Sequence, residues 1–188
     1  MNDVRPRPRT RTRAPAEVYA RILAAAAELL TEGAPLSIGS VADAAGVTKG
    51  AVQHHFGTRE ALLQALWGST QAEFLDDLGR AAARHGGSPL GAASYLRATV
   101  RAGQRRHVTR RWRAVLAACV VERPLARQWS DWVGACRRDN AEGTQELIVR
   151  LAADGLWLSD LLGIYKLSAR ERQALQDALL ARTEAATA

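Results

Sequence analysis

The polar side chains between residues 48 and 55 have a chemistry suited to DNA. Thr48 can cap the start of a helix, and Lys49 in the first turn can pair with a phosphate that the helix N-terminus also attracts. Gln53, one turn further on, offers an amide that can hydrogen-bond base edges in the major groove. A helical period also places three neighbours mostly outward: Ala51, His54 and His55. The segment therefore predicts a helix that contacts DNA.

The residues before this segment would hold the helix in a helix-turn-helix. Ser37 can cap a short helix that runs to Ala45, and Gly46 can take the left-handed backbone conformation that a tight turn requires. Apolar side chains from both short helices can pack beneath the turn: Val41, Ala42, Ala45, Val47, Val52 and Phe56. Two helices joined by a glycine turn are common in proteins, so this spacing alone is weak evidence of DNA binding. The wider sequence provides more specific evidence.

The wider segment, from about Val18 to Trp67, resembles the TetR family of transcriptional regulators. The resemblance is carried by Ile22–Ala26, Thr31–Gly33 and the run Ser40–Leu63. This run follows the pattern V-A-x-x-A-G-V-[ST]-x-G-x-[LV]-x-x-H-F-x-[ST]-[KR]-E-x-L-L, which is seldom met by chance. The resemblance implies that residues 48–55 form a recognition helix in the major groove.

The same resemblance implies roles for individual side chains. Thr48 matches the family's Ser or Thr before the recognition helix, and His55 matches its His. Arg59 stands where the family usually has a phosphate-contacting Lys at the start of the fourth helix. Gln53 departs from the usual Tyr, so it could read a base or contact phosphate. The candidate DNA contacts are Ser37, Thr48, Lys49, Gly50, Ala51, Gln53, His54, His55, Thr58 and Arg59.

The composition predicts an all-α fold of about nine helices, because Ala and Leu dominate the apolar residues of the 188-residue chain. Further helices are expected at about 16–32, from the Thr58 cap, and at about 89–105, 109–121, 124–140, 141–162 and from 168 onward. We expect three parts: a disordered basic arm over 1–15, a helix-turn-helix DNA-binding head over 16–62, and a regulatory and dimerisation bundle over 63–188. The arm could reach DNA phosphates or be a solvated tail.

The segment Leu151–Leu158 is similar to the penultimate helix of many TetR-family members. That likeness implies that this helix and the last one form a four-helix dimer interface. Leucines on one face of each helix are the candidate contacts: Leu147, Leu151, Leu158, Leu162, Leu175 and Leu179. A homodimer would present two recognition helices to a pseudo-palindromic operator in double-stranded DNA.

Tryptophan is concentrated in the C-terminal part of the chain. Aromatic walls suit a flat or cationic organic ligand, although buried Trp is also ordinary core. The candidate pocket residues are Trp67, Tyr95, Trp112, Leu116, Trp129, Trp132, Cys136 and Trp157. Three acids could balance a cation there: Glu122, Asp131 and Asp139. The sequence leaves open whether the group lines a pocket for a small-molecule effector or only fills the core.

The remaining charges and polar groups favour no enzyme. The net charge is +7, and Arg97, Arg101 and Arg105 fall on one helical stripe that is either a second anionic surface or a solvated face. No nucleophile-elbow or phosphate-loop pattern is present, and the adjacent His54 and His55 do not share a helix face. We therefore predict no catalytic residues, no metal and no cofactor.

The location and function follow as expectations. The two cysteines form no C-x-x-C pair, and we see neither a signal peptide nor a transmembrane run, so we expect a cytoplasmic protein with free, buried thiols and no membrane partner. The leading hypothesis is a repressor released from its operator by a small apolar or aromatic ligand. A helical ligand-binding protein or enzyme with an incidental helix-turn-helix, and a DNA-packaging protein, are the alternatives.

Overall fold

The computed structural model describes residues 14–185, with side chains to residue 183. Within that range all regular elements are α-helices, which confirms the predicted fold class: α1 (Pro15–Thr31), α2 (Ile38–Ala45), α3 (Lys49–Phe56), α4 (Arg59–His85), α5 (Ala92–Gly103), α6 (Arg106–Val121), α7 (Arg123–Asp139), α8 (Thr144–Leu162) and α9 (Ala169–Ala185). The arm predicted over 1–15 lies outside the described residues except for Ala14 and Pro15. Pro15 already belongs to α1, since proline suits the first helical turn.

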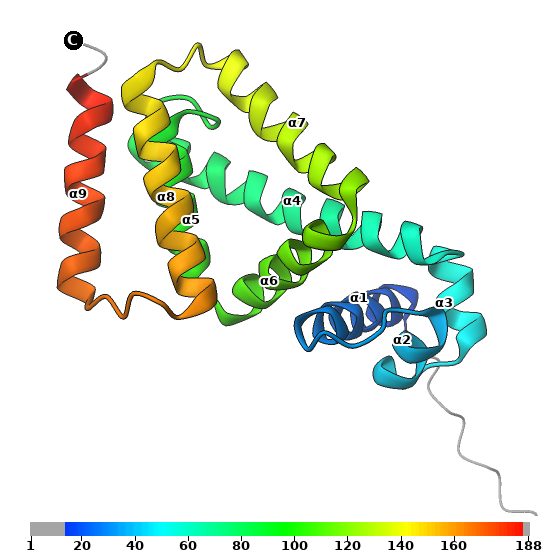
Figure 1. Cartoon of the computed structure of the whole chain (residues 1–188). Helices are drawn as coiled ribbons and strands as arrows, with labels where there is room; N and C mark the ends of the chain where they lie inside the picture. The colour runs from blue at the N-terminus through cyan, green and yellow to red at the C-terminus, as the bar shows by residue number, and fades with distance from the viewer. Residues whose placement is uncertain (1–13, 186–188) are drawn as a thin grey trace, which may run out of the picture.

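The first three helices form a small head at one end of the molecule (Figure 1). Their shared core includes Ile22, Val41 and Val52, whose side chains are fully buried. The 27-residue α4 begins at this head and runs on through the body, a length of about 40 Å. The long helix therefore joins the head to the rest of the fold in one continuous element.

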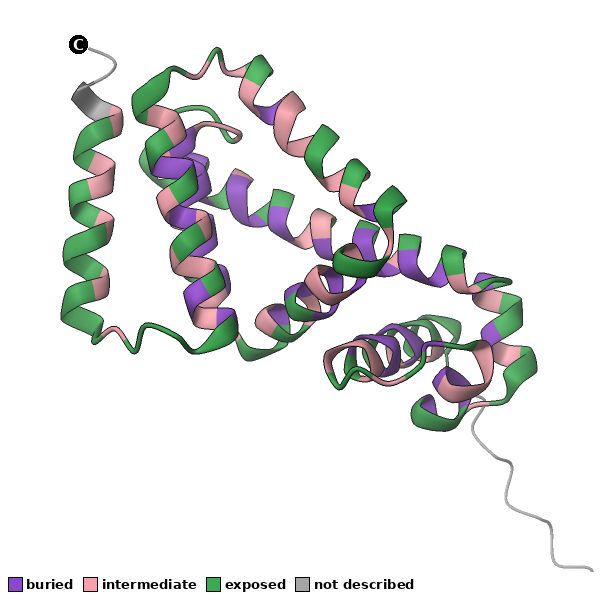
Figure 2. Cartoon of the chain, in the orientation of Figure 1, coloured by how far each residue is buried: buried purple, intermediate pink, exposed green. Residues whose placement is uncertain are grey.

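Helices α4, α5, α6 and α8 enclose the core of the body (Figure 2). α5 lies along α8, and Leu96 of α5 and Val149 of α8 are both fully buried. α6 reaches from this core to the head, where Arg110 Nη1 lies 3.2 Å from Glu28 Oε1 of α1. α6 is thus a second connection between body and head, besides α4.

Helices α7 and α9 are less embedded in the core than α4, α5, α6 and α8. In α7 only Leu125 and Cys136 are buried, and no described side chain of α9 is buried (Figure 2). α8 is apolar on two faces: Val149, Ala153 and Leu161 point inward, whereas other apolar side chains remain exposed. A helix that is apolar all round is normally covered on both sides.

Several helix boundaries differ from the sequence prediction. α5 begins at Ala92 rather than near Pro89, α6 begins at Arg106 rather than Thr109, and α8 begins at Thr144 rather than Ala141. Arg105 was expected on one stripe with Arg97 and Arg101, but α5 ends at Gly103. Arg105 instead donates to Asp77 at 2.7 Å and to Glu73 at 3.0 Å, two acids of α4 that sequence periodicity could not connect with it.

Candidate functional site

Local hydrogen bonds fix the start of α2, and a side chain of α1 holds the turn between α2 and α3. Ser37 Oγ accepts from Ser40 N at 3.0 Å while Ser40 Oγ accepts from Ser37 N at 2.9 Å, so a reciprocal capping box starts α2. Gly46 ends α2 with φ 60° and ψ 43°, the left-handed conformation predicted for it. Arg21 of α1 donates to the backbone oxygens of Ala45 and Gly46, which ties the turn to α1.

The outer surface of α3 presents most of the predicted DNA contacts to solvent. Thr48 Oγ1 accepts from Ala51 N at 3.1 Å and caps α3, as predicted. Lys49 is exposed, and its stem crosses Gly39, where an added Cβ would lie 3.3 Å from Lys49 Cε. Exposed side chains follow along the helix at Gln53 and His54, beside the exposed Gly50.

Three of the predicted contacts are held by the protein itself. His55 is half-buried, and its ring centroid lies 6.0 Å from that of Tyr19 in α1, so it is less outward than the helical period predicted. Thr58 Oγ1 accepts from Ala61 N at 3.0 Å and caps α4. Arg59 Nη2 lies 2.7 Å from Glu122 Oε1, between α6 and α7. The predicted phosphate contact is therefore ion-paired to the body in this structure.

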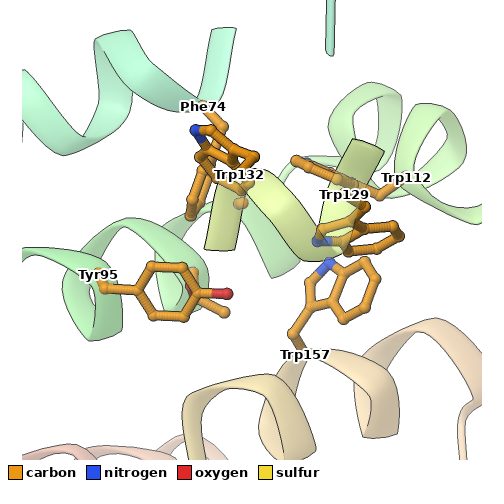
Figure 3. Close-up of a pocket in the computed structure, with 8 residues that line it drawn as sticks. Phe74, Tyr95, Trp112, Trp129, Trp132 and Trp157 are labelled. Carbon is orange, nitrogen blue, oxygen red and sulfur yellow. The ribbon is translucent and has the colours of Figure 1, made fainter. Parts of the chain in front are cut away.

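All five tryptophans of the sequence meet in one cluster in the body. Trp67 of α4, Trp112 of α6, Trp129 and Trp132 of α7, and Trp157 of α8 contact one another with ring centroids 5.4–6.3 Å apart. Figure 3 shows four of these rings with Phe74 and Tyr95 around a common space. Five helices, α4 to α8, thus contribute to one aromatic site.

The space inside the cluster is small. The cavity is about 20 Å³, room for about one water molecule. Its lining comprises Phe74, Tyr95, Thr99, Ala102, Trp112, Trp129, Trp132 and Trp157. Of the predicted pocket residues, Trp67, Leu116 and Cys136 are not part of this lining, and Trp67 packs behind it as a fully buried ring. An organic ligand could enter only if a wall moved.

The acid beside the cavity is Asp154, which was not among the residues predicted from the sequence. Tyr95 Oη donates to Asp154 Oδ1 at 2.5 Å, and burial raises the pKa of Asp154 above its ordinary value of 3.8. The buried Arg150 stacks over the Tyr95 ring at 4.5 Å and is paired to Glu142 at 2.6 Å. Since Glu142 neutralises Arg150, an ionised Asp154 leaves one negative charge next to the aromatic walls.

The three acids expected to balance a cation lie elsewhere. Glu122 is committed to Arg59, and Asp131 and Asp139 are exposed on α7. The side chain of Asp154 lies inward because α8 packs along α5, a contact 59 residues apart in sequence. Helical periodicity in the sequence alone could not predict that Asp154 lies beside Tyr95.

The predicted dimer leucines lie on the outer side of α8 and on α9. Leu151 is 62% exposed, Leu162 58% and Leu158 37%. Leu175 is 42% exposed, and Leu147 and Leu179 are half-buried. Leu179 packs against the core, so the leucines that a single chain leaves open to water are Leu151, Leu158, Leu162 and Leu175.

The described residues hold neither a metal-binding cluster nor a membrane-spanning helix. No group of three His, Cys, Asp or Glu side chains there could hold a metal ion, and no helix is long and apolar enough to cross a membrane. Cys119 is half-buried and Cys136 buried, both as free thiols, and burial raises the pKa of Cys119 to about 11. Such thiols are poor nucleophiles.

Two family models match the chain. Residues 22–66 match bacterial regulatory proteins, tetR family, and residues 92–184 match the tetracyclin repressor-like, C-terminal domain. A comparison with curated proteins finds no match.

Solved structures share the fold across nearly the whole chain. The multidrug binding protein EbrR complexed with imidazole is 23% identical with a TM-score of 0.60, covering 94% of this chain and 97% of that one. EbrR complexed with malachite green is 23% identical with a TM-score of 0.59, covering 87% and 96%. A transcriptional regulator from Rhodococcus sp. Rha1 is 24% identical with a TM-score of 0.59, covering 90% and 93%.

Proposed function

Because the chain belongs to the TetR family of regulatory proteins, we propose that it is a sequence-specific DNA-binding repressor that a small aromatic ligand releases from its operator. The observation that carries the DNA-binding part is the surface of α3. Its cap and turn are fixed to the head, while Lys49, Gln53 and His54 are exposed on one short helix. Lys49 would pair with phosphate, and Gln53 would hydrogen-bond a base edge.

We propose that the working unit is a homodimer built on the outer leucines of α8 and α9. Their exposure, with the opposite face of α8 already buried, supports an isologous contact. Two heads related by a two-fold axis would read a pseudo-palindrome. A transition from monomer to dimer would therefore control operator affinity.

We propose that the ligand is an aromatic cation. Six aromatic rings and the carboxylate of Asp154 supply the two features that such a ligand needs. EbrR, which shares this fold, is described in complexes with ethidium and with malachite green. Since the cavity is only about 20 Å³, binding would require a wall to move. α7 is the candidate, because it carries Trp129 and Trp132 and has only two buried residues.

Glu122 would transmit the effect of ligand binding to the DNA-binding head. This residue is the N-cap of α7 and the C-cap of α6, and its carboxylate holds Arg59 at the start of α4. A displacement of α7 would move Glu122 and with it the orientation of the head. A ligand changes an equilibrium only by its unequal affinity for the two states, typically by about 1–3 kcal/mol.

Genome-wide footprinting of bound DNA tests the proposed function and supplies an operator. Coupling is then measured by titrating the protein with tetraphenylphosphonium, an aromatic cation without a flat ring system to intercalate into DNA. Intrinsic fluorescence reads the proposed pocket directly, because every tryptophan of the chain is in the cluster. Operator should weaken cation binding by the same factor by which the cation weakens operator binding. Equal cation affinity with and without operator would contradict regulation by this ligand. It would not affect the proposal that the protein binds DNA.

A further inference from the structure

A second concave surface lies at the far end of α4, between α4, α5 and α9. It is a groove of about 390 Å³, a size within the range of small-molecule sites. Its lining is mostly polar, unlike that of the aromatic cavity. The polar residues are Asp77, Arg80, Arg84, His85, Arg97, Arg101, Gln104, Gln173, Gln176 and Asp177, and the apolar residues include Ala81, Ala98 and Val100. This surface and the aromatic cavity share no lining residue.

The charge of this groove is positive and partly uncompensated. Four lining arginines face two acids. Asp77 is already paired with Arg80 at 2.7 Å and with Arg105 at 2.7 Å, and Asp177 of α9 accepts a hydrogen bond from Gln173 at 2.8 Å. Among the described residues, Arg84, Arg97 and Arg101 have neither an ion pair nor a hydrogen bond to the protein through their guanidinium groups. Like charges four residues apart on one helix, such as Arg97 and Arg101, repel each other.

We propose that this groove binds a small anion that carries two or more negative charges on carboxylate or phosphate groups. The planar guanidinium group makes paired hydrogen bonds to both of these anions, and three such groups converge here from two helices. An anion would relieve the repulsion between the arginines and would also contact Gln173 and Gln176 of α9. It would thereby fasten α9, which has no buried side chain in its described part, to the body.

Operator DNA is not the occupant of this groove. Arg80 and Arg84 lie 21 and 25 residues beyond Arg59 on α4, so the groove is about 30–40 Å along the helix from the head. The groove and the recognition helix are thus at opposite ends of the element that joins them. The site is independent of the proposed DNA and cation sites, and its test does not depend on either.

The experiment is calorimetric titration of the full chain with pyrophosphate and, separately, with citrate, at constant ionic strength. Wild type should bind at least one anion, and Arg97→Gln with Arg101→Gln should weaken that binding about tenfold or more. The matched control is Arg138→Gln with Arg170→Gln, which removes the same charge from exposed positions outside the groove. The control should bind as wild type does.

The comparison of the two anions identifies the ligand group as phosphate or carboxylate. No binding of either anion by wild type would overturn the proposal. It would equally fall if the control variant lost as much affinity as the groove variant, because the attraction would then come from overall charge. Unchanged helical circular dichroism and unchanged tryptophan fluorescence in both variants keep a folding defect from imitating either outcome.

Discussion

Lys49 and Gln53 occupy the same exposed helix but should contribute to DNA binding in different ways. Lys49→Ala removes a phosphate contact, so it should weaken binding to operator and to random DNA alike and lower the salt slope by about one. Gln53→Ala should instead reduce discrimination between the two sequences, if Gln53 reads a base. Binding isotherms at several salt concentrations separate these effects.

The control for Lys49→Ala is Lys166→Ala, the only other lysine in the chain, which is exposed between α8 and α9. It should leave DNA binding unchanged. If Gln53→Ala weakened binding to all sequences equally, Gln53 would be a backbone contact rather than a base reader.

Asp154 should make cation binding depend on pH. Burial raises the pKa of this carboxyl above 3.8, so the folded protein keeps the proton to a higher pH than a free side chain would. The affinity for tetraphenylphosphonium should therefore be low below the raised pKa and increase as pH rises through it. Asp154→Asn should bind more weakly at neutral pH and lose this dependence. A wild-type affinity that stays constant across that interval would exclude the carboxylate from cation binding.

The helix caps were predictable because each depends on residues within one turn. Ser37, Thr48 and Thr58 cap α2, α3 and α4 as expected, and Ser168 exchanges a reciprocal pair of hydrogen bonds with Glu171 at the start of α9. The Asp154–Tyr95 and Arg59–Glu122 contacts were not predicted, since each joins residues about 60 positions apart. Their partners are chosen by helix packing, which local patterns do not contain.

The ion pair between α4 and the α6–α7 junction should compete with DNA for Arg59. Glu122→Gln would free the guanidinium for phosphate, and operator affinity should rise up to about fivefold, the range of a partly exposed ion pair. Glu28→Gln breaks the other such pair, between α6 and α1, and should change little. A loss of operator affinity in Glu122→Gln would mean that the pair positions Arg59 for DNA instead of withholding it.

The residue types predicted an aromatic group of tryptophans but not which of the rings line the cavity. Their number indicated an aromatic group, and the structure brings all five together. Which of them face the cavity depends on the rotation of four helices, so Trp67 was expected in the lining and lies behind it. The same limit applies to Leu116 and Cys136.

The assembly of two chains should depend on the outer face of α8. Leu158→Arg places a charge in the proposed contact, so light scattering at micromolar concentration should report a monomer, and operator binding should be lost at the same concentration. Leu75→Arg is the matched control, because Leu75 is 40% exposed on α4 against 37% for Leu158. It should remain dimeric. A monomeric wild type would contradict the proposed interface.

A footprint with matched affinity measurements tests whether paired α3 helices read a DNA sequence. We expect a protected site with two-fold symmetry and an affinity for it about a thousandfold or more above that for random DNA. The same footprint should vanish with Leu158→Arg at working concentrations and persist with Leu75→Arg. Equal affinity for every sequence would contradict the account and favour a protein that packages DNA without reading it.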